Sequence, residues 1–221
     1  MMKKLSVPGN KYLALSKKLI AGLLLLVSSI LPAQADQAAV NRLGSLLDKM
    51  DSLDAGFQQR ILDARGARLQ EVDGKLSLKR PGKFYWQTEN PFPQTVVSDG
   101  STLWLFDPDL EQVTIQQIDE SISRTPAMLL SGDVASITEK FEVLKVRDSD
   151  IEEFVLRPKE EESLFEELRL NFADQWLVSL LLVDSLGQRT AIELRDVRFN
   201  QEQKAGRYTF NVPDGVDVIQ Q

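Results

Sequence analysis

Most of the side chains that could do chemistry are carboxylates, because the 221-residue chain has 33 acidic residues but no histidine and no cysteine. Ser-His-Asp and Cys-His nucleophiles and the usual zinc sites therefore cannot be built. Runs such as Glu160–Glu162 and Asp148-Ser149-Asp150 are typical of solvated loops. The carboxylates could still include a catalytic pair that face each other at roughly 5 to 10 Å, as in a glycosidase. We expect no enzyme, no metal and no cofactor.

Arg80 is the cation whose position its neighbours define best. Pro81-Gly82 favours a turn, and a proline holds the residue before it in extended backbone, so Arg80 is predicted at the end of a strand. Its guanidinium has five donors and could reach several carbonyls at once. An arginine at a strand end can equally be a solvated charge worth about 0 to 1 kcal/mol. The residues alone leave both roles open.

Aromatic side chains are concentrated just after Arg80. Alternation along a strand places Phe84 and Trp86 on one face and Tyr85 on the other, and it divides Leu103-Trp104-Leu105-Phe106 in the same way. Spacing does not tell which set faces inward. Such strands usually form an ordinary sealed core, and the alternative is the wall of an apolar cavity.

The first 35 residues have the features of an export signal. Five lysines and no acid accompany a short apolar run from Leu19 to Leu31, and Ala33-Gln34-Ala35 is a small-x-small cleavage site. The run is shorter than the roughly 20 residues of a membrane span. We expect cleavage after Ala35, no stable membrane anchor, and one exported, soluble domain over residues 36–221.

Charge argues against two kinds of partner. Without the leader the chain keeps 21 basic and 33 acidic residues, a net charge of −12. Nucleic acids and anionic membrane surfaces would be repelled. We expect neither as a partner, and we expect a monomer.

The elements that must position these side chains are one helix and many short strands. Apolar residues at three- and four-residue spacing predict a helix from about Ala38 to Leu53, ended by Asp54-Ala55-Gly56. Hairpin turns are predicted at Asp73-Gly74, Asp99-Gly100 and Leu186-Gly187. Alternating segments predict about eleven antiparallel strands; they include Leu76–Leu78, Val113–Ile115, Phe154–Leu156, Leu168–Phe172, Ile192–Leu194 and Tyr208–Val212.

A second helical region is predicted in the middle of the chain. Thr125 is a good N-cap, Pro126 suits the first helical position, and Gly132 can end the turn. Asp133 can cap a further helix over Val134–Lys140. These short helices could form a movable flap or simply plug one end of a barrel.

Four segments together resemble the periplasmic outer-membrane lipoprotein carrier family, LolA. The first, residues 76–86, holds Lys79-Arg80-Pro81 and the aromatic strand. The second, residues 96–106, holds a Ser-Asp-Gly hairpin before Leu103-Trp104-Leu105-Phe106. The others are residues 125–130 and 210–216, so the resemblance covers nearly all of the chain after the leader.

The resemblance implies a mainly β (α+β) fold, an incompletely closed antiparallel barrel of about eleven strands covered by a helical lid. It implies that Arg80 is a latch that holds the lid closed. It also favours Phe84 and Trp86 as inward-facing. The expected acyl-chain cavity and lid residues are Phe84, Trp86, Leu43, Leu47, Met50, Met128, Leu129 and Leu130.

The resemblance further implies the partners of a carrier. Acylated lipoproteins would be received from the inner-membrane ABC transporter LolCDE and delivered to the outer-membrane receptor LolB. LolB itself is lipid-anchored, which a chain without cysteine cannot be. The sequence departs from the common family pattern at Gly82-Lys83 and at Ala127, which puts local docking contacts and the cavity roof in doubt. The alternative is a periplasmic lipid- or lipoprotein-sensing module of similar fold, a class that generally carries a second domain.

Overall fold

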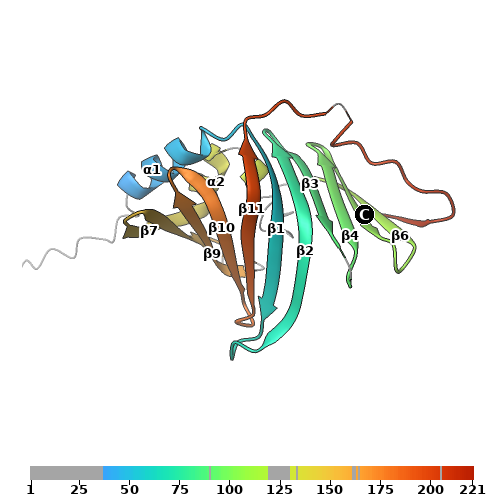
Figure 1. Cartoon of the computed structure of the whole chain (residues 1–221), viewed down its shortest axis with the longest axis horizontal. Coiled ribbons are helices and arrows are strands. Elements are labelled where there is room, and N and C mark those ends of the chain that lie inside the picture. The colour runs from blue at the N-terminus through green and yellow to red at the C-terminus, as the bar shows by residue number, and fades with distance from the viewer. Residues whose placement is uncertain are drawn as a thin grey trace, which may run out of the picture. The chain divides into compact units, whose positions relative to one another are not determined.

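The computed structural model describes residues 37–89, 91–118, 130–132, 134–160, 163, 165–204 and 206–221. Twelve strands of this part form one sheet, in the order β12-β6-β5-β4-β3-β2-β1-β11-β10-β9-β8-β7 (Figure 1). The strands are β1 Ser52–Leu62, β2 Arg68–Lys79, β3 Lys83–Thr88, β4 Gln94–Asp99, β5 Thr102–Asp107, β6 Gln112–Gln117, β7 Phe141–Asp148, β8 Ile151–Pro158, β9 Phe165–Ala173, β10 Trp176–Asp184, β11 Arg189–Phe199 and β12 Asp217–Gln220.

Neighbouring strands run antiparallel throughout, except that β12 lies parallel to β6. Consecutive strands pair because the turns between them are short, and pairing of β1 with β11 joins the two halves of the sheet. The end strands β12 and β7 are not paired with each other, so the barrel is incompletely closed, as predicted.

The inner face of the sheet is the one that meets the helices. Cross-strand partners lie on the same face, and the register pairs Leu53 with Leu78, Leu78 with Phe84, and Leu76 with Trp86. All five side chains are buried. The predicted alternation is confirmed, because Tyr85 lies on the opposite, outer face against Arg207.

Two helices cover the inner face. Helix α1 spans Gln37–Leu47 and α2 spans Val134–Lys140, and α1 contacts both α2 and β7 (Figure 1). The bounds of α2 agree with the prediction. Within the described residues, neither helix has the length and apolar character needed to cross a bilayer.

The predicted end of the first helix was wrong. Helix α1 stops at Leu47, and Asp54-Ala55-Gly56 lies inside β1 instead of ending a helix. The error arose because Met50 and Leu53 continue the three-residue spacing of α1. Leu53 is instead buried as an inward-facing residue of β1, where side chains alternate between the two faces of the sheet.

The predicted turn at Asp73-Gly74 was also wrong, because both residues lie in the middle of β2. Position 74 requires glycine because there is no room for a side chain. A Cβ there would lie 2.2 Å from the ring of Phe57, the cross-strand partner of Gly74. The other two predicted turns are present. Gly100 and Gly187 sit there with φ of 103° and 77°, in the left-handed region that favours glycine.

A C-terminal arm, residues 200–216, follows β11 and leads to β12 (Figure 1). It includes Tyr208–Val212, which was predicted as a strand and has no strand structure. The alternation there has another cause: part of the arm packs on the outer face of the sheet, with the Phe210 and Phe106 rings 5.8 Å apart. The arm hides apolar residues of the outer face that would otherwise be exposed.

Candidate functional site

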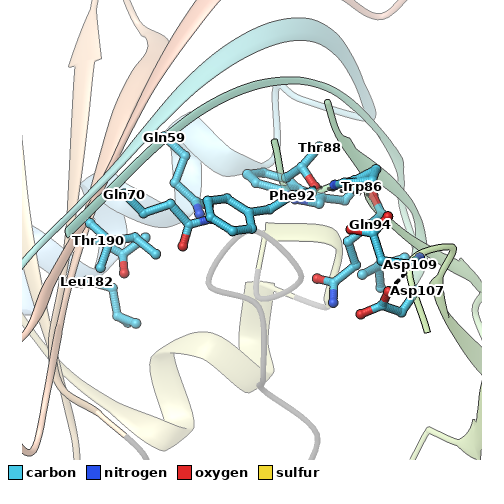
Figure 2. Close-up of a pocket in the computed structure, with 13 residues that line it drawn as sticks. Gln59, Gln70, Trp86, Thr88, Phe92, Gln94, Asp107, Asp109, Leu182 and Thr190 are labelled. Atoms are coloured by element: carbon cyan, nitrogen blue, oxygen red, sulfur yellow. Dashed lines mark hydrogen bonds between the residues drawn. The ribbon is translucent and has the colours of Figure 1, made fainter. Parts of the chain in front are cut away.

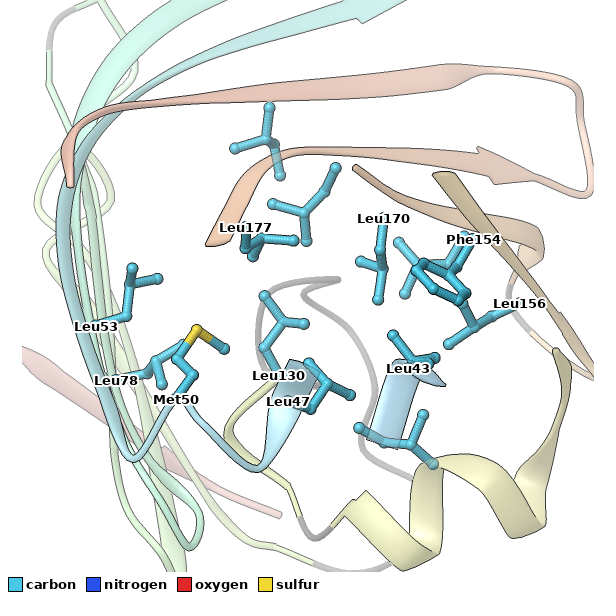
Figure 3. Close-up of a cluster of buried hydrophobic side chains, with 14 of the residues drawn as sticks. Leu43, Leu47, Met50, Leu53, Leu78, Leu130, Phe154, Leu156, Leu170 and Leu177 are labelled. Carbon is cyan, nitrogen blue, oxygen red and sulfur yellow. The ribbon is translucent and has the colours of Figure 1, made fainter. Parts of the chain in front are cut away.

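The inner face and its helical cover share one buried apolar cluster (Figure 3). Six of the predicted cavity and lid residues lie in this cluster, namely Leu43, Leu47, Met50, Phe84, Trp86 and Leu130. The other two, Met128 and Leu129, lie outside the described residues. Leu43 and Leu47 reach the cluster from α1, and in Figure 3 they face side chains of the sheet such as Leu170. The cover is therefore packed directly onto the sheet, in a closed arrangement.

A cavity of 480 Å³ opens on the same inner face, beside this cluster (Figure 2). Its apolar lining comes from Ile61, Trp86, Val96, Leu182 and the loop residues Phe92 and Pro93. Glutamine, threonine and aspartate side chains complete the lining, among them Gln59, Gln70, Gln94, Thr88, Thr190, Asp107 and Asp109. The cavity thus offers an apolar wall with a polar edge, a composition that suits an amphiphile.

Trp86 belongs to both the cavity and the buried cluster. Its ring stacks on Phe57 with centroids 3.7 Å apart and lies 6.3 Å from Phe84. Through these stacked rings, the cavity wall at Trp86 is continuous with the buried cluster that contains Phe57 and Phe84.

Arg80 lies directly after the end of β2, in the turn to β3, as predicted. Its backbone N–H donates to Asp51 O at 2.9 Å, and the Nε and Nη2 atoms of its guanidinium are buried. Arg80 is also engaged in a further polar, electrostatic or ring interaction. In the same turn, Gly82 N–H donates to Ser131 O at 2.7 Å. This turn therefore holds the chain segment that carries Leu130.

A second attachment joins α1 to the far side of the sheet through ion pairs. Arg42 donates to Glu152 of β8 through Nε at 2.9 Å and Nη2 at 2.5 Å, and Lys145 Nζ of β7 lies 2.8 Å from the same carboxylate. These bonds, the Arg42 pair foremost, lower the pKa of Glu152 to about 2 despite its partial burial. We call these three residues the α1 clamp.

The α1 clamp was missed by sequence reasoning, although a signal was present. Glu152 is in phase with the buried Phe154 and Leu156, so alternation places a carboxylate on an apolar face. Such an acid requires a cationic partner. The partner, Arg42, is 110 residues away and could not be named from spacing.

The described residues contain no group of three or more acidic side chains that could together hold a metal ion. The carboxylates nearest the cavity are Asp107 and Asp109. Asp107 accepts the backbone N–H groups of Asp109 and Leu110 at 3.0 Å, so it shapes a turn.

Comparison with known proteins gives consistent matches. The sequence model of the family described as outer membrane lipoprotein carrier protein LolA matches residues 48–211. The outer-membrane lipoprotein carrier protein of Azotobacter vinelandii is 46% identical over 190 residues, covering 86% of this chain and 92% of the relative. That of Pseudomonas aeruginosa is 48% identical over 186 residues, covering 84% and 89%. Among solved structures, an uncharacterized conserved protein from Thermus thermophilus superposes with a TM-score of 0.52 at 12% identity, covering 85% of this chain and 100% of that one, which shows the fold alone.

Proposed function

The chain belongs to the outer membrane lipoprotein carrier protein LolA family, a family of periplasmic transport proteins and not of enzymes, and from this premise we propose that it carries acylated lipoproteins toward the outer membrane. The family match over residues 48–211 is the observation that carries the proposal. The buried apolar cluster under a separable cover gives it a physical basis, because acyl chains can take the place of the cover's own side chains.

The size of the cavity supports a cover that moves. The acyl chains of a triacylated lipoprotein hold about 45 to 50 carbons. At about 30 Å³ per carbon, close to the volume of a water molecule in the liquid, these chains occupy roughly 1,400 Å³. The cavity of 480 Å³ is too small to hold all of them. We propose that one chain starts in the cavity beside Trp86 and that the others enter as α1 and the Leu130 segment lift from the sheet.

Energetics favour transfer between apolar surroundings. Complete removal of the chains from water would release some 35 to 40 kcal/mol at roughly 0.8 kcal/mol per methylene, whereas non-covalent affinities saturate near 18 to 21 kcal/mol. Release into water is therefore excluded as a step. Transfer from an apolar donor to the carrier and on to an apolar acceptor is nearly neutral, so the small free energy of closing the cover can set the direction.

We propose that the turn at Arg80 is the latch of the cover. Support comes from the bond between Gly82 N–H and Ser131 O, which ties this turn to the segment that carries Leu130. Charge-assisted hydrogen bonds contribute roughly 1.5 to 3 kcal/mol each. A few such bonds from the Arg80 guanidinium to the cover would bias it toward closure without locking it. Met128 and Leu129 remain proposed lid residues.

The finer features of the pathway are also proposals. The donor is the transporter LolCDE and the acceptor is the receptor LolB. The leader is removed after Ala35, and residues 36–221 act as one domain in the periplasm. These proposals rest on the family match and on the sequence of the first 35 residues.

Native mass spectrometry of the mature protein purified from periplasm tests the function. We expect a bound triacylated lipoprotein that leaves when membranes bearing the receptor are added. Membranes without the receptor are the control and should leave the complex intact. An empty protein, or one holding free lipid that the receptor does not remove, would contradict the proposal and favour the lipid-sensing module.

A further inference from the structure

A groove runs between the C-terminal arm and the outer face of the sheet, away from the cavity. It consists of two hollows of 380 and 250 Å³ that share Gln203, Lys204 and Arg207. Arg207 fixes one wall: it donates to Asp54 at 3.1 Å, and its guanidinium lies 5.2 Å from the centre of the Tyr85 ring. The groove is therefore a built feature of the arm's packing.

Four cationic side chains besides Arg207 line the groove. Lys79 and Lys83 are cross-strand neighbours on β2 and β3 and line the smaller hollow. Lys204 of the arm lines both hollows, and Arg198, near the end of β11, lines the larger one. All four side chains are exposed. Within the described part of the chain, none of them has a hydrogen bond or an ion pair from its side chain.

Most of the acidic side chains that line the groove already accept hydrogen bonds from other groups of the protein. Asp54 accepts bonds from Arg207, Ser77 and Gln203. Burial would raise the pKa of Asp99, but backbone N–H bonds from Thr102 and Ser101 lower it, so that carboxylate serves its own turn. Glu202 alone remains as a counter-charge among the described lining residues.

One further group in the groove lacks a partner. The Tyr208 side chain lines the 250 Å³ hollow and is 8% exposed, and its hydroxyl has no hydrogen bond within the described residues. A buried hydroxyl without a partner is unfavourable. A carboxylate that entered the hollow could accept this bond as the side chains adjusted.

We propose that the groove is a docking site for an acidic, extended segment of a partner protein. Charge complementarity is the argument, because four cations that have no partner among the described residues gather here on a chain whose formal net charge is −7. A peptide fits better than an anionic membrane, since the site is a pair of adjoining hollows and the acidic protein as a whole is repelled by an anionic surface. The site shares no lining residue with the acyl cavity and does not require cargo to bind its partner.

The groove borders the turn that holds the cover. Lys79 and Lys83 flank Arg80-Pro81-Gly82, and Gly82 binds Ser131. A partner docked on these lysines would touch the proposed latch from outside the barrel. Docking and opening of the cover can thus be coupled through a single turn.

The test titrates the ¹⁵N-labelled mature protein at low ionic strength with a ten-residue glutamate peptide as the probe. Shifts should gather at Lys79, Lys83, Lys204 and Tyr208. Replacing the three lysines by glutamine should weaken binding about tenfold, since three ion pairs of surface strength are removed. A charge-matched control replaces Arg65, Arg68 and Lys75 of the β1–β2 hairpin by glutamine. All three are exposed and none lines the groove, so this variant should bind as the parent does.

Three results would overturn the proposal. The first is absence of binding, and the second is an equal loss in the control variant, which would indicate a general charge effect. In the third, inorganic phosphate or phosphatidylglycerol vesicles shift the same residues and bind more tightly than the peptide, which would make the site one for phosphate groups. None of these results changes what native mass spectrometry would show about bound cargo. Failure of this docking site can therefore be told apart from failure of the carrier function.

Discussion

Replacing Glu152 by glutamine should free α1 from the sheet and destabilise the protein at neutral pH. The side chain keeps its shape but loses the charge that Arg42 and Lys145 bind. The pKa of Glu152 is lowered from 4.5 to about 2. At 1.36 kcal/mol per pKa unit, this displacement corresponds to about 3 kcal/mol. Because the Arg42 side chain is 35% exposed and solvent screens the pair, we expect a loss of about 1 to 2 kcal/mol.

The sign of the pH dependence follows from the direction of the shift. A carboxylate with a lower pKa in the folded state stabilises that state above its unfolded pKa, here near 4.5, and loses the effect as the pH falls toward 2. The glutamine variant lacks the effect at every pH. The two stabilities should therefore differ most above about pH 5 and approach each other in acid.

Urea unfolding followed by tryptophan fluorescence measures the difference, and hydrogen exchange locates it. More than about half of the stability gap should disappear between pH 6 and pH 3, and the α1 amides should exchange faster in the variant. Glu153→Gln is the matched control, because Glu153 pairs with Arg169 at 3.0 Å and does not hold α1. A gap that is equal at both pH values, or α1 exchange that rises equally in the control, would refute this role of the α1 clamp.

Three further predictions concern the latch, the sheet and the cover. Arg80→Leu should leave folding and cargo uptake largely intact but slow release to receptor membranes, and normal transfer would remove Arg80 from the mechanism. Gly74→Ala should lower the free energy of unfolding by about 2 to 3 kcal/mol, because its Cβ would lie 2.2 Å from the Phe57 ring. Gly56→Ala, whose nearest contact is 3.7 Å, is the control and should be tolerated in the same urea titration. Leu47→Ala should destabilise the closed state by about 2 to 5 kcal/mol and speed hydrogen exchange of α1, and unchanged exchange would place the mobility elsewhere.

Local signals in the sequence determined several parts of the fold. The hairpin at Asp99-Gly100 requires a positive φ that glycine supplies, so it is encoded by two residues. The alternation of Phe84, Tyr85 and Trp86 fixed which side chains share a face. The family motif around Arg80 indicated the carrier class, and the family match agrees with it.

Other features were decided only when distant segments met. Periodicity could not end α1 at Leu47, because a helical spacing and a strand alternation fit Met50 and Leu53 equally well until packing selected one. Gly74 looked like a turn because the Phe57 ring that excludes a side chain there comes from another strand.

The inner face, the α1 clamp and the groove of the arm all form from residues that are far apart in the sequence. Arg42 and Glu152 are 110 residues apart, and Arg207 and Asp54 are 153 apart. The sequence by itself determined the backbone preferences and the side-chain periods, because these act between neighbours in the chain. Tertiary structure alone decided which charges and rings meet, because burial and pairing energies depend on contacts that exist only once the sheet has formed.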